Sequence, residues 1–185
     1  MTLSNTDTID LGSLFEPAGV VVAGASSHPG KFGFAVLHNI ITCGYQGRVF
    51  ATNRNGGNLP GIECLTSVAQ VPAGQADLVY VCVPAAAVAQ VLRDAASVGI
   101  RAAFIASSGF GEGHDGEGAA HGAELAALAD ELGMVIAGPN GQGLVSTPVS
   151  LCAQFVGPFP PAGGVSIVSQ SGNLASGAMN YATAS

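Results

Sequence analysis

The segment 24–33 (GASSHPGKFG) has the residue types of an anion-binding turn. It follows a short apolar run, and its glycines, with Ser26 and Ser27, allow backbone N–H groups to turn toward one point. A helix that begins near Lys31 would aim the positive end of its dipole at the same place, and Lys31 adds a full charge. An ordinary glycine-rich turn with an exposed lysine is the alternative. We favour phosphate binding by this turn.

The spacing of the glycines and the second apolar run argue against NAD. The turn reads Gly24-x5-Gly30 rather than G-x-G-x-x-G, and the run at 48–52 is followed by Asn53 and Arg54, with no acidic residue to hold the ribose hydroxyls. Arg54 suits a phosphate, which both NADP and coenzyme A supply. A solvated loop cation explains Arg54 equally well, so the sequence leaves the two interpretations open.

Further polar turns follow the other apolar runs. Val83 and Pro84 end one run, and a proline in the first turn of a helix wastes no N–H group, although a plain helix start is the alternative. The segments 107–112 (SSGFGE) and 138–141 (GPNG) are short polar turns after two more runs. The segment 169–172 (SQSG) precedes the last expected helix and resembles another anion cradle, but a simple helix N-cap explains it equally.

Other reactive side chains lack the spacing of a catalytic or metal site. The sequence has no CxxC pair, and no cysteine has a histidine at ligand spacing. The histidines show no constellation of partners that would make a general base. We therefore assign no metal, no disulfide and no catalytic residue among Cys43, Cys64, Cys82, Cys152, His28, His38, His114 and His121.

The composition excludes two classes of partner. The formal net charge is −7, and the five Lys and Arg residues cannot form a basic stripe for nucleic-acid phosphates. No apolar stretch approaches the roughly 20 residues that a membrane span needs, and the N-terminal residues lack the basic start of a signal peptide. We expect a cytoplasmic protein that holds a phosphorylated ligand largely with backbone N–H groups and helix N-termini.

Short apolar runs alternate with helix-like stretches. The runs are continuous, as in strands that are buried on both faces, and lie at 19–24, 48–52, 78–83, 102–106 and 134–137. The helix-like stretches, each followed by a glycine, lie at 32–43, 85–98 and 117–132, and a further short helix is expected at 66–71. This order predicts an α/β fold, a Rossmann-like doubly wound parallel sheet that binds ligands at the carboxyl ends of its strands.

The pattern changes after Asn140. We expect a strand at 151–156, a Pro/Gly-rich connection at 157–164, a new strand at 165–168 and a helix from about Asn173. One strand and one helix cannot bury a core of their own. We therefore divide the chain into an N-terminal tail at 1–13, a Rossmann-like domain at 14–150, and a connection with the first βα unit of a truncated second α/β domain at 151–185.

Five segments, in this order, resemble the NDP-forming acyl-CoA synthetases, which are related to the succinyl-CoA synthetase alpha subunit. They are LFEPAGVVVAGAS (14–26), PGKFG (29–33), DLVYVCVPA (77–85), GPNGQG (138–143) and VSIVSQSGNLA (165–175). The resemblance implies a CoA-binding domain followed by a succinyl-CoA-ligase-like domain. It also implies a ligase that interconverts acid, CoA and ATP with acyl-CoA, ADP and phosphate through an acyl phosphate and a phosphohistidine.

By position, the resemblance implies that coenzyme A lies along the carboxyl edge of the sheet. The residues implied for its phosphates are Gly24, Ala25, Ser26, Ser27, Lys31, Phe32 and Gly33, followed by Asn53 and Arg54. Those implied for its path and its thiol end are Val83, Pro84, Ser107, Ser108, Gly109, Pro139 and Asn140. The residues implied to receive the phosphohistidine are Ser169, Gln170, Ser171 and Gly172.

Departures from the family pattern limit what the chain is expected to do alone. The family has Asn-Pro-Lys after its second strand, where this chain has Asn53, Arg54 and Asn55, so the replacement of the lysine by Arg54 is left open. No histidine matches the phosphohistidine, which is expected beyond Ser185. We expect this chain to be the CoA-binding portion of a ligase and to be inactive alone. The ligase would need an ATP-grasp domain or subunit to bind ATP or ADP with magnesium. Its substrate would be a small carboxylic acid, and the protein could form a homo-oligomer.

Two other functions compete with this one. A stand-alone CoA- or nucleotide-sensing regulatory domain would share the first turn, but it would need no phosphohistidine cradle at 169–172. An NADP-dependent dehydrogenase is disfavoured by the absence of an acidic residue after the second apolar run.

Overall fold

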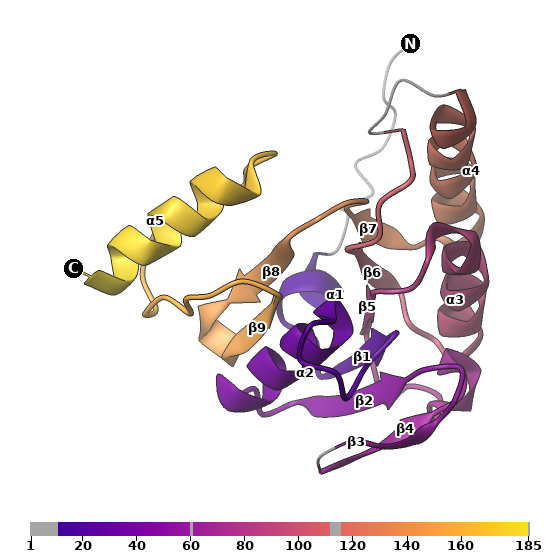
Figure 1. Cartoon of the computed structure of the whole chain (residues 1–185), viewed down its shortest axis with the longest axis horizontal. Helices are drawn as coiled ribbons and strands as arrows, with labels where there is room; N and C mark the ends of the chain where they lie inside the picture. Colours follow the sequence, from indigo (N-terminus) through magenta and orange to yellow (C-terminus); the bar gives the residue numbers. More distant parts are fainter. Residues whose placement is uncertain (1–10, 60, 112–115, 185) are drawn as a thin grey trace.

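The computed structural model describes residues 11–59, 61–111 and 116–184. Seven of its strands form one sheet with the spatial order β3-β4-β2-β1-β5-β6-β7 (Figure 1). Neighbouring strands are parallel except β3 and β4, which are antiparallel. The strands are β1 (Gly19–Ala23), β2 (Arg48–Thr52), β3 (Gly57–Leu59), β4 (Ile62–Leu65), β5 (Leu78–Val81), β6 (Ala102–Ile105) and β7 (Val135–Ala137).

The order of the sheet reverses at β1. The chain runs outward from β1 through β2 to β4, and then crosses back to β5, β6 and β7 on the other side. Doubly wound sheets bind ligands in the crevice at this reversal, outside the carboxyl ends of the two central strands. The loop after β1 and the turn after β5 therefore lie where a ligand is expected.

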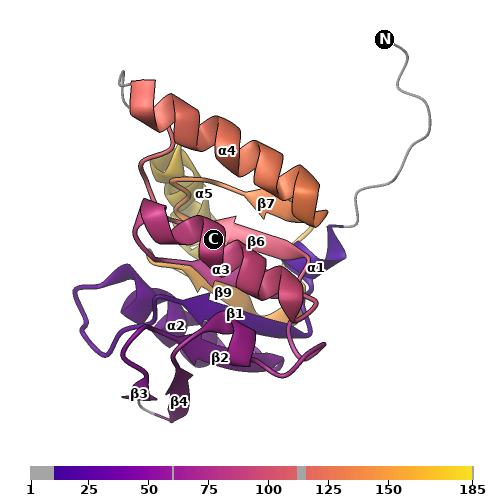
Figure 2. The same ribbon diagram turned by 90° about the vertical axis from the view of Figure 1, so that its right-hand side faces the viewer.

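Both faces of the sheet are covered (Figures 1 and 2). One face packs against two long helices and a short 3₁₀ helix, and the other packs against two helices and a hairpin. The elements of the first face are η1 (Val68–Gln70), α3 (Ala85–Ser97) and α4 (Gly116–Leu132). Those of the second face are α1 (Gly12–Phe15), α2 (Phe32–Thr42), β8 (Gly143–Ser146), η2 (Thr147–Val149) and β9 (Leu151–Gln154).

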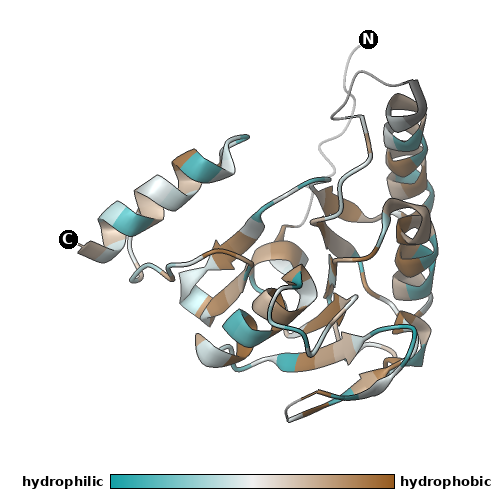
Figure 3. Ribbon diagram, viewed as in Figure 1, coloured by the Kyte–Doolittle hydropathy of each residue, from teal (hydrophilic) through white to brown (hydrophobic). Residues whose placement is uncertain are grey.

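The burial of β1 explains its continuous apolar sequence. Val20 and Val22 are fully buried in the core beside α2 and the hairpin, whereas Val21 and Ala23 are fully buried in the core beside α3 and α4. Successive side chains of a strand point to opposite faces, so a strand covered on both faces needs an apolar residue at every position. The hydropathy colouring shows the central strands largely brown, with teal residues on the outer helices and loops (Figure 3).

The predicted parallel sheet is confirmed, with element ends that shift by one or two residues. The five predicted strands correspond to β1, β2, β5, β6 and β7, and the three predicted helices to α2, α3 and α4. The short helix expected at 66–71 is the 3₁₀ helix η1. The strands β3, β4 and β8 were not predicted, because they are short and β3 (Gly-Asn-Leu) has no β-branched or aromatic residue.

Past β9 the chain leaves the core and reaches α5 (Gly172–Ala184), which has no buried residue. The strand predicted at 151–156 exists as β9, but it pairs antiparallel with β8 in a separate two-stranded sheet. The strand predicted at 165–168 is wrong: these residues form no strand, and Val165 and Val168 are 85% and 97% exposed. A strand needs a neighbouring strand to pair with, and the described part of the chain places none beside this segment.

The helix α5 stands apart from the main sheet, at the yellow end of the colour scale in Figure 1. Within the described residues, no helix is long and apolar enough to span a membrane.

Candidate functional site

Close backbone packing shapes the turn between β1 and α2. The N–H groups of Gly24 and Ala25 both donate to the Thr52 carbonyl, at 2.8 and 3.0 Å, which ties the turn to the end of β2. Gly24 has φ +87°, and a Cβ there would lie 2.6 Å from the Cys82 carbonyl oxygen. A Cβ on Gly33 would lie 2.1 Å from the Gly24 oxygen. Both positions therefore require glycine, which lets the turn pack closely against the end of β5 and the start of α2.

Side chains of the turn fix its shape by local hydrogen bonds. The His28 N–H donates to Ser26 Oγ at 3.0 Å, and the Gly30 N–H donates to His28 Nδ1 at 3.1 Å. His28 is thus a positioning residue that the sequence did not indicate, and its Nδ1 accepts, so the proton of the neutral ring sits on Nε2. Ser27 is exposed and makes no such bond.

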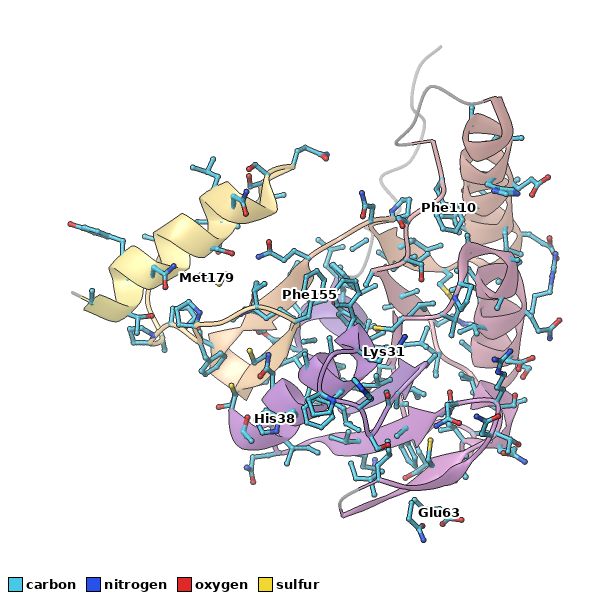
Figure 4. All side chains as sticks on the ribbon, viewed as in Figure 1. Lys31, His38, Glu63, Phe110, Phe155 and Met179 are labelled. Atoms are coloured by element: carbon cyan, nitrogen blue, oxygen red, sulfur yellow. The ribbon has the colours of Figure 1, made fainter. Side chains whose placement is uncertain are left out.

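The turn delivers the chain to the N-terminus of α2. Lys31 is the N-cap residue, is exposed, and makes no capping hydrogen bond with its side chain. The first N–H groups of a helix have no acceptor within the helix, so they and the dipole face the turn. Phe32 follows, 57% exposed, and stacks on Phe155 with ring centroids 4.3 Å apart. Lys31 and Phe155 lie near each other at the centre of Figure 4.

Asn53 ties three segments together at the end of β2. Its Nδ2 donates to the Ala25 oxygen at 3.4 Å and to Cys64 Sγ at 3.2 Å, and its Oδ1 accepts from the Asn55 N–H at 2.8 Å. The side chain of Asn53 is therefore used to hold the loops in place. Arg54 is exposed beside it. An open hollow of about 460 Å³ lies at this edge, lined by Asn55, Gly56, Gly57, Glu63, Cys64, Leu65, Thr66 and Gln70.

The ends of β5, β6 and β7 are joined by hydrogen bonds. Ser107 Oγ donates to the Val83 carbonyl, and the Asn140 N–H donates to the Ser107 carbonyl at 2.9 Å. The peptide bond between Gly138 and Pro139 is cis, and Asn140 has a left-handed φ of +53°. Pro84, Ser108 and Gly109 are exposed along the same edge. The structure thus brings together the segments predicted after all three strands.

The predicted phosphohistidine cradle forms a local turn. Ser171 N–H donates to Ser169 Oγ at 3.0 Å, and Leu174 N–H donates to Ser171 Oγ at 3.3 Å, so Ser171 caps α5. Gln170 is exposed, and Gly172 begins the helix. A side-chain bond from Gln142 Nε2 to Ser176 Oγ, 2.7 Å long, connects α5 to the chain that follows Asn140.

Histidines and thiols form no metal-binding cluster within the described residues. Those residues hold no group of three or more His, Cys, Asp or Glu side chains that could bind a metal. His38 is exposed on α2, His121 Nδ1 lies 3.2 Å from the Gly109 oxygen, and His114 lies outside the described residues. Burial raises the pKa of Cys82 to about 12, so this thiol stays protonated at neutral pH.

The sheet order and the turns at this edge define a Rossmann-type domain. The chain belongs to the CoA binding domain family, whose model matches residues 19–146.

Relatives of known name match most of the chain by sequence. The chain is 36% identical over 178 residues to the alpha subunit of the ADP-forming acetate–CoA ligase I of Pyrococcus furiosus, which covers 94% of this chain and 38% of that subunit. It is 36% identical over 167 residues to a trans-feruloyl-CoA synthase of an unknown prokaryotic organism, covering 88% of this chain and 23% of that protein.

A solved structure also matches. It is a dinucleotide-forming acetyl-coenzyme A synthetase of Ca. Korarchaeum cryptofilum in complex with phosphate and ADP, with a TM-score of 0.85 and 34% identity. The match covers 95% of this chain and 37% of that one. The chain therefore spans less than two fifths of the length of each of these three proteins.

Proposed function

We propose that this chain binds coenzyme A across the carboxyl edge of its sheet, with the phosphates at the N-terminus of α2. The observation that carries the proposal is the turn from Gly24 to Lys31. It approaches β5 so closely that only glycine fits, and it ends on free helix N–H groups beside an exposed lysine. The donors of this site are backbone N–H groups and one cation, which is the chemistry that a diphosphate needs.

The rest of the cofactor has a matching surface on either side of this turn. Arg54 and the hollow beside β4 lie toward β2, where a ribose phosphate and a base would be held. Val83 and Pro84 border the switch point, and Ser108, Gly109 and Asn140 are exposed beyond it, where the thiol end would lie. Gly24, Ala25, Ser26, Ser27, Phe32 and Gly33 shape the phosphate turn, and Asn53, Ser107 and Pro139 support the loops around it.

We further propose that the chain supplies the CoA-binding portion of an ADP-forming acyl-CoA synthetase. One relative is named as an ADP-forming acetate–CoA ligase and another as a trans-feruloyl-CoA synthase, and each extends well beyond the matched region. One name specifies acetate and the other ferulate, so for this chain we propose only the substrate class, a carboxylic acid. ATP or ADP with magnesium would bind to an ATP-grasp domain or subunit, and the protein would work in the cytoplasm.

The apolar residues past β9 support this larger assembly. Val165, Val168 and Tyr181 are 85%, 97% and 78% exposed, which is unusual for residues of these types. We propose that 151–185 is the connection to, and the start of, a second α/β domain whose remaining elements would cover α5. Ser169, Gln170, Ser171 and Gly172 would then face the phosphohistidine.

Calorimetry with coenzyme A, NADP and ATP tests the proposed function. We expect binding of coenzyme A, and none of ATP, to the 185-residue chain. Tighter binding of NADP than of coenzyme A would instead indicate a dehydrogenase domain. In a coupled assay, the chain alone should form no acyl-CoA from acid, CoA and ATP; formation of thioester would contradict the need for a further domain.

A further inference from the structure

The helix that bears the phosphate site carries a cysteine at its opposite end. Cys43 is the C-cap residue of α2 and is half-buried, whereas Cys152 lies on β9 and is 2% exposed. Both thiols are free. Figures 1 and 2 show α2 and β9 side by side, so two elements far apart in sequence each bring a thiol to one interface.

One hydrogen bond fixes how these elements lie against each other. Asn39 Nδ2 on α2 donates to the Gln154 carbonyl on β9 at 2.8 Å. Cys43 lies one turn after Asn39 on the same face of the helix, about 6 Å along it. Cys152 lies two residues before Gln154, about 7 Å along the strand. Phe32, at the start of α2, stacks on Phe155, just after β9, so the two elements run in opposite directions and both steps lead the same way along the interface.

The thiols also affect each other chemically. Gln154 Nε2 lies 3.7 Å from Cys152 Sγ, which shows that both side chains are on one face of β9. The pKa of Cys152 is raised to about 12, first by burial, and then by charge and hydrogen bonding with Cys43.

We propose that Cys43 and Cys152 form a reversible disulfide on exposure to hydrogen peroxide, joining the C-terminal end of α2 to β9. The half-exposed Cys43 reacts first: its thiolate attacks one peroxide oxygen, the O–O bond breaks, and the leaving hydroxide takes a proton to become water. The Cys152 sulfur then attacks the sulfur of the Cys43 sulfenic acid. The S–O bond breaks, and the hydroxide leaves as water with the proton of Cys152.

The electrons balance, because the two thiols give up two electrons and the peroxide accepts them. We expect a specific pairing, since Cys64 lies on β4 and Cys82 follows β5, whereas Cys43 and Cys152 lie on the adjoining elements α2 and β9. A link from residue 43 to residue 152 closes a long loop, so it restricts the unfolded chain and should raise the midpoint of thermal unfolding. This inference does not depend on coenzyme A binding.

Mass spectrometry of the full 185-residue chain tests the proposal. The protein is treated with a slight excess of hydrogen peroxide, denatured, alkylated and digested. We expect the intact protein to lose two hydrogens in mass, a linked pair of peptides that contain Cys43 and Cys152, alkylated Cys64 and Cys82, and reversal by dithiothreitol. Cys43→Ser and Cys152→Ser should each abolish the linked pair, and the control Cys82→Ser should retain it.

The peptide map of the unmodified sequence decides the question even if a variant fails to fold. Recovery of Cys43 as a sulfinic acid with Cys152 still open to alkylation would overturn the proposal. A link that involves Cys64 or Cys82, or four thiols unchanged after treatment, would overturn it as well.

Discussion

The hydrogen bonds of polar side chains differ in range between the carboxyl edge of the sheet and the segment 155–184. At the edge they bond between strands: Ser107 reaches Val83, and Asn53 reaches Ala25 and Cys64. In the C-terminal segment, Ser169 and Ser171 bond only to residues within the same short turn. The conformation of the edge therefore depends on hydrogen bonds between distant segments, whereas that of the C-terminal turn depends on hydrogen bonds between residues close in sequence.

Glycines show the same contrast. Added Cβ atoms at Gly24 and Gly33 would collide with backbone, while Gly163, Gly164 and Gly177 have nothing within 4 Å. Glycine loses more backbone entropy on folding than other residues do, and where nothing lies near it, no close approach of another segment offsets this cost. The edge is thus closely packed, whereas these three glycines of the C-terminal segment have no neighbours within 4 Å.

The largest expected effect is a difference in amide hydrogen exchange between the two regions. Amides of β1, β5 and β6 should exchange only through global opening, which costs about 5–15 kcal/mol in a domain. Amides from Val165 through α5 should exchange with little protection, because no residue of α5 is buried. The measurement is made on dilute protein at two concentrations. Slow, concentration-independent exchange of α5 would mean that the helix packs stably on its own domain.

A matched pair of glycine substitutions sharpens the contrast. Gly24→Ala places a Cβ 2.6 Å from the Cys82 oxygen at φ +87°, so we expect a loss of about 2–4 kcal/mol in the free energy of unfolding, from strain and overpacking. Gly177→Ala, in open space within α5, should cost nothing and improves helix propensity by up to about 1 kcal/mol. Urea unfolding measures both, and equal losses would contradict the comparison.

The sequence predicted the sheet because burial on both faces leaves a direct mark. A run such as Val20, Val21 and Val22 has no polar face, and only a strand between two layers accommodates it. The run at 165–168 has a similar composition but forms no strand, because pairing depends on a neighbour that this run does not determine. The strand β9 was predicted, but its antiparallel pairing with β8 was missed for the related reason that pairing depends on a neighbour, and β8 was not predicted.

The site was predicted at the level of segments rather than of contacts. Glycine, serine and lysine types identified the turn 24–33 from general chemistry. The use of His28 Nδ1 to accept from Gly30, and of Asn53 to connect Ala25 with Cys64, depends on distances that only the fold sets. The pairing of Cys43 with Cys152 likewise follows from how α2 lies on β9, a placement that residue types and spacing do not show.

Substitution of single basic residues tests where coenzyme A binds along the edge. Lys31→Ala should weaken coenzyme A binding by roughly 1–2 kcal/mol, or about 5- to 30-fold, because it removes one charge-assisted contact at the α2 N-terminus. The matched control is Arg48→Ala, which removes the same charge at the first residue of β2, on the opposite edge of the sheet. Arg54→Ala decides whether that arginine also binds a phosphate.

Calorimetry at two salt concentrations provides the measurement, since screening weakens exposed charge contacts. Equal affinity of the Lys31 variant and the unmodified chain would remove Lys31 from the site. An equal loss in the Arg48 variant would show that net charge, rather than position, controls binding.

The smallest expected effect concerns one of the contacts between the two regions. Gln142 Nε2 donates to Ser176 Oγ at 2.7 Å, and the Gln142 side chain lies against Gly172 at the start of α5. Gln142→Ala should therefore lower the opening free energy of α5 by about 0.5–1.5 kcal/mol, the value of one hydrogen bond, without changing global unfolding. Ser176→Ala removes the same bond from the other side, so the double variant should be no worse than either single one.

Exchange rates of α5 amides measure the change, and urea unfolding serves as the control. If both single variants leave α5 exchange unchanged, the hydrogen bond does not hold the helix. If instead they lower global stability, α5 is part of the cooperative domain, and the distinction between a formed edge and an unfinished C-terminal segment fails.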